Sequence, residues 1–376
     1  MTDEPKILRV SVTELQDFMR CHRAWDLRSP NRQSLVLRGV PRTELHIGSA
    51  MHYGWEYQAL GYDPMEALDR WFDEEIVKLG TEYATTVGAP MGTEERNRLD
   101  ESREFCKELM QSYVDKWGPN PIAPLTYLAP EFAFMIPLPL ITKEYDAVYL
   151  VGTIDGVATD PDGELVTVEH KTYSQKPTDL SLDHQMHGYG WALAQLVGTP
   201  PAYSLYDGAN KRLPKDPKPL QSGRLSVAKD QGMTTPEKYL EAMKQHRQPM
   251  DDTYAAHLDW LKRANEGEQT PFHYRQQVSL HEHALKQWGE DMIDIVAEMA
   301  SEPALYPHFR WEGCWDCDFA QTLCPAIQRG EDLQFMVEQY YHVGTYGTQK
   351  SVRTVTPSEV SSVADLTELV REWRVE

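Results

Sequence analysis

The chain has 376 residues, of which 41 % are hydrophobic and 25 % charged, a composition typical of a globular protein of roughly two or three domains. Neither an apolar signal segment nor the ~20 consecutive apolar residues that cross a bilayer are found, so we expect a cytoplasmic protein without membrane contacts. The formal net charge of −21 argues against a nucleic-acid enzyme, because phosphate binding requires a positive surface.

Two basic segments interrupt this acidic background. Residues 20–42 hold six arginines against one acid, and residues 211–229 hold six basic residues against one acid, so each segment carries a net charge of +5. Such segments could hold a DNA strand, and two solvated loops would have the same composition. Charge alone leaves both interpretations open.

The N-terminal part of the chain is predicted to be helical. Ser11 and Glu14 form a capping-box pattern at the start of a first helix, and Cys21 lies near its end. Residues 44–118 continue with apolar residues three to four apart and without strand-like alternation. A proline-rich stretch at 119–124 closes this region.

β structure is predicted from residue 127 onward. Residues 127–136 form one strand, and residues 145–171 form a hairpin whose turn suits a three-residue loop with Gly163 in the left-handed conformation. Residues 183–197 are expected to be a helix. The later segments are predicted to be a long loop followed by two helical stretches, at 207–236, 236–265 and 279–301.

The predicted hairpin brings two acids and a lysine together. With loop residues 161–163, Asp155 faces Glu169 on the opposite strand, and Lys171 projects from the same face. Opposed carboxylates are destabilising unless a cation neutralises them, and Mg²⁺ or Mn²⁺ prefers carboxylate oxygens. An E-x-K triplet by itself is more often an exposed Glu–Lys pair, so the matched register is what favours a metal site suited to phosphodiester hydrolysis.

The five cysteines point to metal ligation or reactive thiols, because an odd number in a long chain argues against a disulfide framework. Cys314, Cys317 and Cys324 form a compact run of soft ligands that needs a fourth member. The spacing does not distinguish zinc from an iron–sulfur cluster. The candidates for the fourth ligand are Cys21, Cys106 and a histidine such as His308, although Cys106, within a helical pattern, is better explained as a small buried side chain.

These motifs resemble those of the PD-(D/E)xK nuclease superfamily, in particular its RecB-like branch. GTIDG at 152–156 followed by VEHKT at 168–172 is similar to the superfamily signature, and Glu131 resembles the acid on its preceding strand. His52 resembles the upstream histidine ligand of many members. Gln185 and Tyr189 resemble the Q-x-x-x-Y helix motif and share one helix face.

The resemblance implies a role for each of these residues. The metal ligands would be His52, Asp155, Glu169 and the backbone carbonyl of His170, and Lys171 would be the catalytic lysine. Gln185 and Tyr189 would position water or substrate. One departure is His170 itself, because an apolar residue is commoner between the acid and the lysine.

The cysteine pattern is similar to that of CRISPR-associated, phage and AddB-type members, which have one cysteine near the N-terminus and three near the C-terminus. It implies that a 4Fe–4S cluster is held by Cys21, Cys314, Cys317 and Cys324. The cluster would join the two ends of the chain beside the nuclease core. The resemblance extends over residues 11 to about 332.

We therefore expect an α/β fold of the restriction-endonuclease-like type, with a small mixed central sheet flanked by helices. The expected divisions are an N-terminal helical region, a nuclease core, a loop insertion with helices, an iron–sulfur segment and a tail of unknown role, at 1–125, 126–205, 206–306, 307–335 and 336–376. No phosphate-binding loop of the G-x-x-x-x-G-K-[ST] form is present, so ATP-driven translocation is not expected.

The expected function is that of an Mg²⁺- or Mn²⁺-dependent DNA exonuclease acting on single strands or duplex ends in recombination, repair or DNA processing. A recombination or CRISPR-type protein would be a compatible partner. Trp25, Tyr53 and Trp55 are candidates for stacking on bases. Two alternatives remain: a catalytically inactive DNA-binding or adaptor protein on the same fold, and a zinc-stabilised RNA-processing protein.

Overall fold

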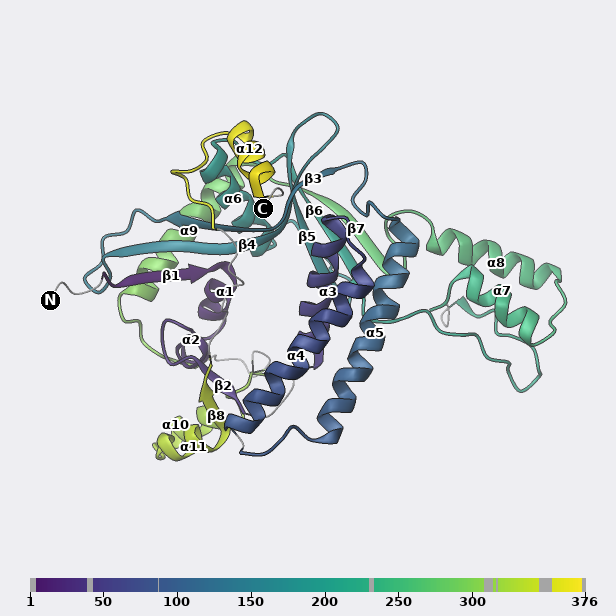
Figure 1. Ribbon diagram of the computed structural model, residues 1–376, viewed down its shortest axis with the longest axis horizontal. Helices are drawn as coiled ribbons and strands as arrows, with labels where there is room; N and C mark the ends of the chain where they lie inside the picture. The colour runs from purple at the N-terminus through teal and green to yellow at the C-terminus, as the bar shows by residue number, and fades with distance from the viewer. Residues whose placement is uncertain are drawn as a thin grey trace.

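A computed structural model describes residues 5–38, 43–86, 88–229, 233–307, 314–315, 317–344 and 354–373. At its centre lies a mixed sheet with the strand order β1-β4-β5-β6-β7, and β3 pairs with β4 (Figure 1). β1 is parallel to β4 and β5 is parallel to β6, whereas the other neighbours are antiparallel. The strands are β1 (Ile7–Ser11), β3 (Thr126–Pro137), β4 (Ala147–Thr159), β5 (Leu165–Tyr173), β6 (Tyr203–Asn210) and β7 (His273–Ser279).

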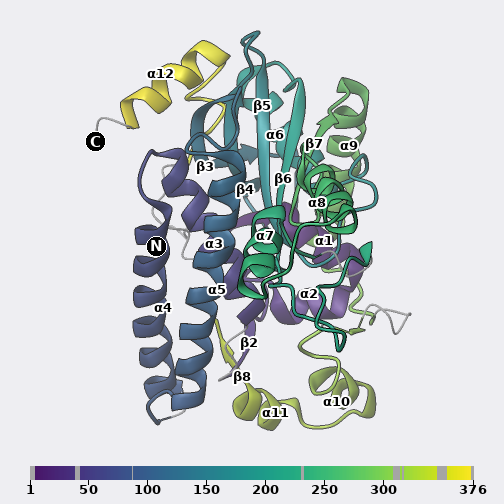
Figure 2. The same ribbon diagram turned by 90° about the vertical axis from the view of Figure 1, so that its right-hand side faces the viewer.

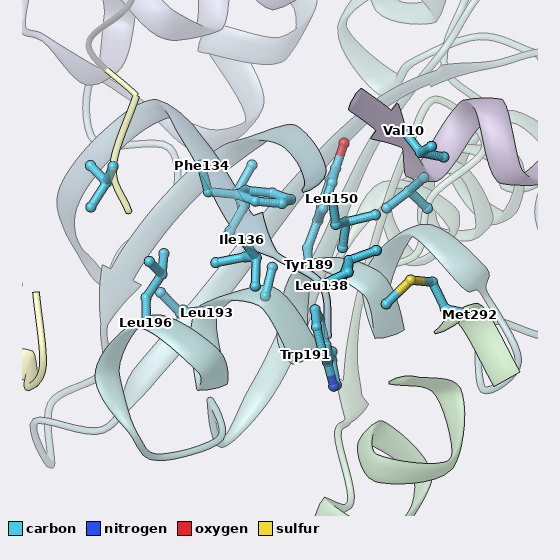
Figure 3. Close-up of a cluster of buried hydrophobic side chains, with 14 of the residues drawn as sticks. Val10, Phe134, Ile136, Leu138, Leu150, Tyr189, Trp191, Leu193, Leu196 and Met292 are labelled. Atoms are coloured by element: carbon cyan, nitrogen blue, oxygen red, sulfur yellow. The ribbon is translucent and has the colours of Figure 1, made fainter. Parts of the chain in front are cut away.

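Helices cover the sheet on both sides, which confirms the expected α/β class. The predicted helical stretch at 44–118 consists of three helices that pack side by side (Figures 1 and 2): α3 (Thr43–Ala59), α4 (Pro64–Thr86) and α5 (Thr93–Trp117). The main core, part of which is drawn in Figure 3, instead joins β3 and β4 to other helices, which include α1 (Val12–Arg20), α6 (His184–Val197), α9 (Glu282–Ala300) and α12 (Val363–Trp373). None of the helices in the described ranges is both long and apolar enough to span a lipid bilayer.

The first helix begins with the predicted capping box. Ser11 Oγ accepts a hydrogen bond from the Glu14 backbone N–H at 3.1 Å, and the Glu14 carboxylate accepts one from the Ser11 backbone N–H. The Glu14 carboxylate is buried and also accepts hydrogen bonds from the side chains of Trp25, Ser29 and Asn31. A buried carboxylate requires such donors, so Glu14 ties α1 to α2 (His22–Arg28) and to the loop after it.

The turn of the β4–β5 hairpin follows the predicted geometry. Gly163 has a φ of 85°, and its N–H donates to the carbonyl of Asp160 at 3.0 Å. The strands pair from Thr159 with Leu165 to Gly156 with Val168, the register expected for a loop at 161–163. The pairing ends there, one residue before Asp155 would meet Glu169.

The central sheet extends beyond the core expected at 126–205, because β1 and β7 also belong to it. Between β6 and β7 the chain leaves the sheet and forms α7 (Pro236–Gln245) and α8 (Asp252–Asn265), which project from the body in Figure 1. These two helices bury a small core of their own that includes Tyr239, Tyr254 and Leu261.

The C-terminal tail packs on the rest of the protein. β8 (Tyr341–Val343) pairs antiparallel with β2 (Leu35–Leu37), next to α10 (Leu323–Arg329) and α11 (Leu333–Tyr340). Farther on, Val355 bridges to Phe134 of β3, and α12 buries Leu366 and Val370 in the main core. The tail therefore covers the outer edge of the sheet at β3.

Candidate active site

The candidate site lies where the neighbours of β4 change. Along one edge of β4, β1 pairs with residues 147–151 and β5 pairs with residues 156–159. Asp155 lies in the fork between these two pairings. Its Oδ2 accepts a hydrogen bond from the His170 backbone N–H at 2.8 Å. This side-chain contact links β4 to β5 at the point where their backbone pairing has ended.

Glu131 occupies the position across from Asp155 on the other neighbour of β4. Pro130 pairs with Gly156 and Phe132 pairs with Ile154, which leaves Glu131 opposite Asp155. Glu131 has a φ of 46°, a left-handed conformation that costs a non-glycine residue about 1–3 kcal/mol. Such strain is concentrated at functional sites. The sequence predicts Glu131 as the acid on the preceding strand but not as a metal ligand. Its backbone conformation cannot be read from the sequence.

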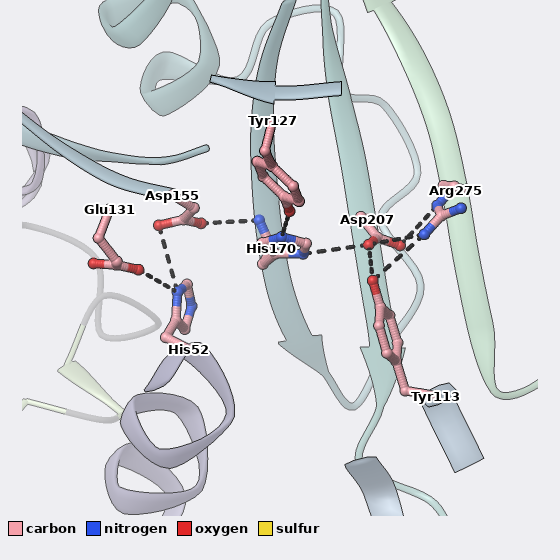
Figure 4. Close-up of polar contacts among 8 residues, drawn as sticks. All are labelled: His52, Tyr113, Tyr127, Glu131, Asp155, His170, Asp207 and Arg275. Carbon is pink, nitrogen blue, oxygen red and sulfur yellow. Dashed lines mark hydrogen bonds and ion pairs between the residues drawn. The ribbon is translucent and has the colours of Figure 1, made fainter. Parts of the chain in front are cut away.

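His52 completes a compact group with these two carboxylates. From α3, its Nδ1 lies 3.4 Å from Asp155 Oδ1 and 3.9 Å from Glu131 Oε1 (Figure 4). One ligand atom from each of the three residues lies within 4.8 Å of the others. A nitrogen and two carboxylate oxygens at this spacing can bind one divalent cation.

The electrostatics of this group favour a positive charge. Burial by itself would lower the pKa of His52, but the carboxylates of Asp155 and Glu131 raise it to about 10. Burial would raise the pKa of Asp155, and the charge of His52 outweighs it and lowers that pKa. Without a metal, the histidine proton therefore supplies the positive charge that the buried Asp155 and the half-buried Glu131 require.

Glu169 and Lys171 lie beside this group rather than within it. Burial and the nearby Asp155 carboxylate raise the pKa of Glu169 to about 8. Its Oε1 forms an ion pair with Lys171 Nζ, and its buried Oε2 accepts no hydrogen bond from the described part of the chain. The lone pairs of Oε2 are available to a cation next to His52 and Asp155.

The helix motif on α6 holds the lysine. Lys171 Nζ donates to Gln185 Oε1 at 2.9 Å, and Gln185 Nε2 donates to the Tyr189 hydroxyl at 2.9 Å. Tyr189 is only 8 % exposed, whereas Gln185 and Lys171 line a cleft together with His52 and Glu131. The geometry thus directs Tyr189 toward Gln185 and not toward the cleft.

The aromatic residues expected to stack on bases divide into two groups. Tyr53 lines the cleft, as does the basic residue Lys211 from the second basic segment. Trp25 and Trp55 are each only 2 % exposed, so the expectation for them is wrong. Both indoles are used inside the protein: Trp25 donates to Glu14, and Trp55 stacks on the His170 ring.

The four cysteines of the predicted cluster line one pocket. Cys21 lies between α1 and α2, Cys324 belongs to α10, and Cys314 and Cys317 precede it. Burial raises the pKa of Cys106 to about 12 within the α3–α5 core, as expected for a small buried side chain, and His308 lies outside the described residues.

The first basic segment makes contacts inside the protein. Arg28 lies 3.1 Å from Asp17 and 3.5 Å from Asp318, and Arg23 donates to Cys324 Sγ at 3.5 Å. These arginines thus join the N-terminal helices to the cysteine segment. Arg42, at the end of the basic segment, lies outside the described residues.

Comparisons with known proteins identify the family. A solved structure titled "Crystal structure of SSO0001" is 12 % identical over 85 % of this chain and 86 % of its own, and its TM-score of 0.30 is too low to assign a fold. No curated protein matches the sequence. The model of the PD-(D/E)XK nuclease superfamily matches residues 9–325, which include the fork, the cleft and all four cysteines of the pocket. Nucleases of this superfamily use divalent metal ions, and this chain belongs to the PD-(D/E)XK nuclease superfamily.

Proposed function

We propose that the protein is an Mg²⁺- or Mn²⁺-dependent deoxyribonuclease that hydrolyses phosphodiester bonds from strand ends. The observation that carries the proposal is the convergence of His52, Glu131 and Asp155 beside a cleft that His52, Glu131 and Lys171 line. This arrangement favours a catalyst over an inactive scaffold, because a divalent cation would neutralise the two carboxylates more fully than the single proton of His52 does.

The donor set fits a divalent cation. His52, Glu131 and Asp155 would hold it, and the buried Glu169 Oε2, which accepts no hydrogen bond from the described residues, offers a further ligand. The backbone carbonyl of His170 stays a predicted ligand. A bound Mg²⁺ or Mn²⁺ supplies charge stabilisation and lowers the pKa of its water.

Lys171 carries the protein's own positive charge at the reacting phosphate. Its hydrogen bond to Gln185, which is in turn bonded to Tyr189, fixes the ammonium group at the wall of the cleft. A charge that is positioned in advance stabilises developing negative charge without reorganisation. Gln185 and Tyr189 would then act by positioning the lysine.

The cleft suits a single strand with a free end. Lys211 offers a charge for a backbone phosphate, and Tyr53 lines the same cleft with 9 % of the residue exposed. With a net charge of −21, the protein can neutralise few phosphates, which favours a short contact over a long duplex footprint. Work at strand ends would serve recombination, repair or DNA processing, with a recombination or CRISPR-type protein as a compatible partner.

We further propose that the cysteine pocket holds a 4Fe–4S cluster. The four cysteines of the pocket come from both ends of the chain and supply the number of thiolates that such a cluster takes. Four thiolates also suit a zinc ion, so the metal content of the purified protein separates the two.

The test is digestion of end-labelled linear DNA and of closed circular DNA in Mn²⁺. We expect rapid loss of linear single strands and strong resistance of the closed circle. Equal cleavage of both would indicate an endonuclease with an open cleft. No cleavage of either, together with tight DNA binding, would indicate an inactive DNA-binding protein.

A further inference from the structure

A row of charged and polar side chains crosses three strands next to the candidate site. His170 of β5 is in register with Asp207 of β6, and Asp207 is in register with Arg275 of β7. Nδ1 of His170 lies 3.3 Å from Asp207 Oδ2, and Arg275 donates to both Asp207 oxygens at 2.9 and 3.0 Å (Figure 4). Helix α5 covers this row.

The row is buried, and ion pairs and hydrogen bonds converge on its central carboxylate. The exposed fractions of His170, Asp207 and Arg275 are 3 %, 0 % and 4 %. The Tyr113 hydroxyl of α5 donates to Asp207 Oδ2, and the Arg275 guanidinium lies 3.7 Å from the ring centroid of Trp117 on the same helix. The fully buried carboxylate thus has three polar neighbours, His170, Arg275 and Tyr113.

Stability alone does not account for such a row. Desolvation of buried charges cancels most of their attraction, and apolar side chains of similar volume are often as stable. A buried ion pair is better explained where it fixes one geometry among several. The row of His170, Asp207 and Arg275 is therefore expected to fix the position of a neighbouring part of the protein.

His170 connects the row to the candidate metal site. Its backbone N–H donates to Asp155 Oδ2 at 2.8 Å. Its ring stacks on Trp55 of α3, with ring centroids 4.8 Å apart, and Trp55 follows three residues after His52. On the other side of the ring, Nε2 lies 2.8 Å from the Tyr127 hydroxyl of β3. One imidazole therefore contacts β3 and α3, while its backbone holds the acid of β4.

We propose that Asp207, held by Arg275 and Tyr113, is a positioning residue of the metal site that acts through His170. It fixes the His170 ring, and the ring fixes both the spacing between α3 and β5 and the N–H that orients Asp155. This role rests on the proposed function, because it requires a cation at His52 and Asp155. It also explains why a histidine stands between Glu169 and Lys171, where the superfamily more often has an apolar residue.

The test is Mn²⁺ affinity, measured by electron paramagnetic resonance on purified full-length protein. Asp207→Asn removes the charge but keeps the size of the side chain, and we expect Mn²⁺ to bind about ten- to a hundredfold more weakly, as for other residues that orient metal ligands. kcat for DNA cleavage should fall by a similar factor while KM for DNA stays unchanged, since the cleft residues Tyr53 and Lys211 are untouched. The matched control is Tyr254→Phe, which removes a buried hydroxyl in the α7–α8 core.

A second variant covers the case in which Asp207→Asn fails to fold. Asp207→Leu combined with Arg275→Met removes the row without leaving an unpaired buried charge. Wild-type Mn²⁺ affinity in either folded variant would overturn the positioning role and leave the proposed function intact. Equal loss of affinity in Tyr254→Phe would also overturn it, because general loosening would then be the cause. If the wild-type protein binds no Mn²⁺, the proposed function fails as well.

Discussion

The Asp155 side chain contributes both a negative charge and a hydrogen-bonding shape to the candidate site. Substitution by asparagine removes the charge and keeps the shape. The His170 N–H that donates to Asp155 Oδ2 can donate to an amide oxygen equally well. The amide nitrogen can donate to a neutral His52, which lies 3.4 Å away. Asp155→Asn should therefore fold normally but lose one of the two carboxylates that neutralise a cation with His52.

The size of the effect follows from the linkage between binding and unfolding. A cation that binds only the folded state at 100 times its Kd stabilises that state by about 2.7 kcal/mol. At about 2.1 cal/mol/K per residue, the 376 residues have an unfolding entropy of roughly 0.8 kcal/mol/K. Saturating Mn²⁺ should then raise the Tm of the wild-type protein by about 3 °C.

Differential scanning fluorimetry in EDTA and across a Mn²⁺ titration measures this shift. The wild-type protein should show it, Asp155→Asn should show less than about a third of it, and the two Tm values in EDTA should be similar. Asp162→Asn is the matched control, because Asp162 is an exposed acid at the tip of the same hairpin. A full Mn²⁺ shift in Asp155→Asn would refute the assignment of the site.

Three further predictions concern the lysine, the cysteines and pH. Lys171→Ala should reduce cleavage by about 10²–10³-fold while keeping the Mn²⁺ shift in Tm, because the lysine stabilises charge and is not a ligand; unchanged cleavage would contradict this role. Anaerobically purified protein should contain about four irons per chain. Cys21→Ser should lose this iron and Cys106→Ser should keep it, whereas stoichiometric zinc would contradict the proposed cluster. Burial lowers the pKa of His273 to about 4, so its contribution to stability is complete above about pH 6.5 and is lost as the pH falls toward 4. The free energy of unfolding measured in urea should therefore fall by up to about 3 kcal/mol over this range in the wild-type protein but not in His273→Gln. The same pH profile of unfolding free energy in both proteins would contradict this prediction.

The hairpin acids were predictable from the sequence because local rules set their register. The turn at 160–163 requires a left-handed residue, and Gly163 supplies it. This turn sets the register of the hairpin and brings Asp155 and Glu169 to its same end, so their proximity can be predicted without the rest of the fold. The helical spacing of Gln185 and Tyr189 was predictable for the same reason. The same reasoning extended the pairing one residue too far, because the fork between β1 and β5 depends on a distant strand.

Features that depend on long-range pairing could not be predicted. Glu131 opposes Asp155 through a strand that pairs on the other edge of β4, and its left-handed backbone is not encoded by residue type. The neighbours Asp207 and Arg275 are separated in sequence by α7, α8 and a long loop, which hide the pairing of β6 with β7. The Glu14 carboxylate has a capping pattern in sequence, but its further hydrogen bond from the buried indole of Trp25 depends on the fold.

The most direct test of the nuclease assignment is the rate of nucleotide release from end-labelled linear single-stranded DNA in Mn²⁺. The wild-type protein should cleave it, EDTA should abolish cleavage, and Asp155→Asn should be at least about a hundredfold slower. Both proteins should show the same unfolding curve in EDTA. Cleavage by Asp155→Asn at the wild-type rate, or wild-type cleavage that persists in EDTA, would contradict catalysis at the fork of β4.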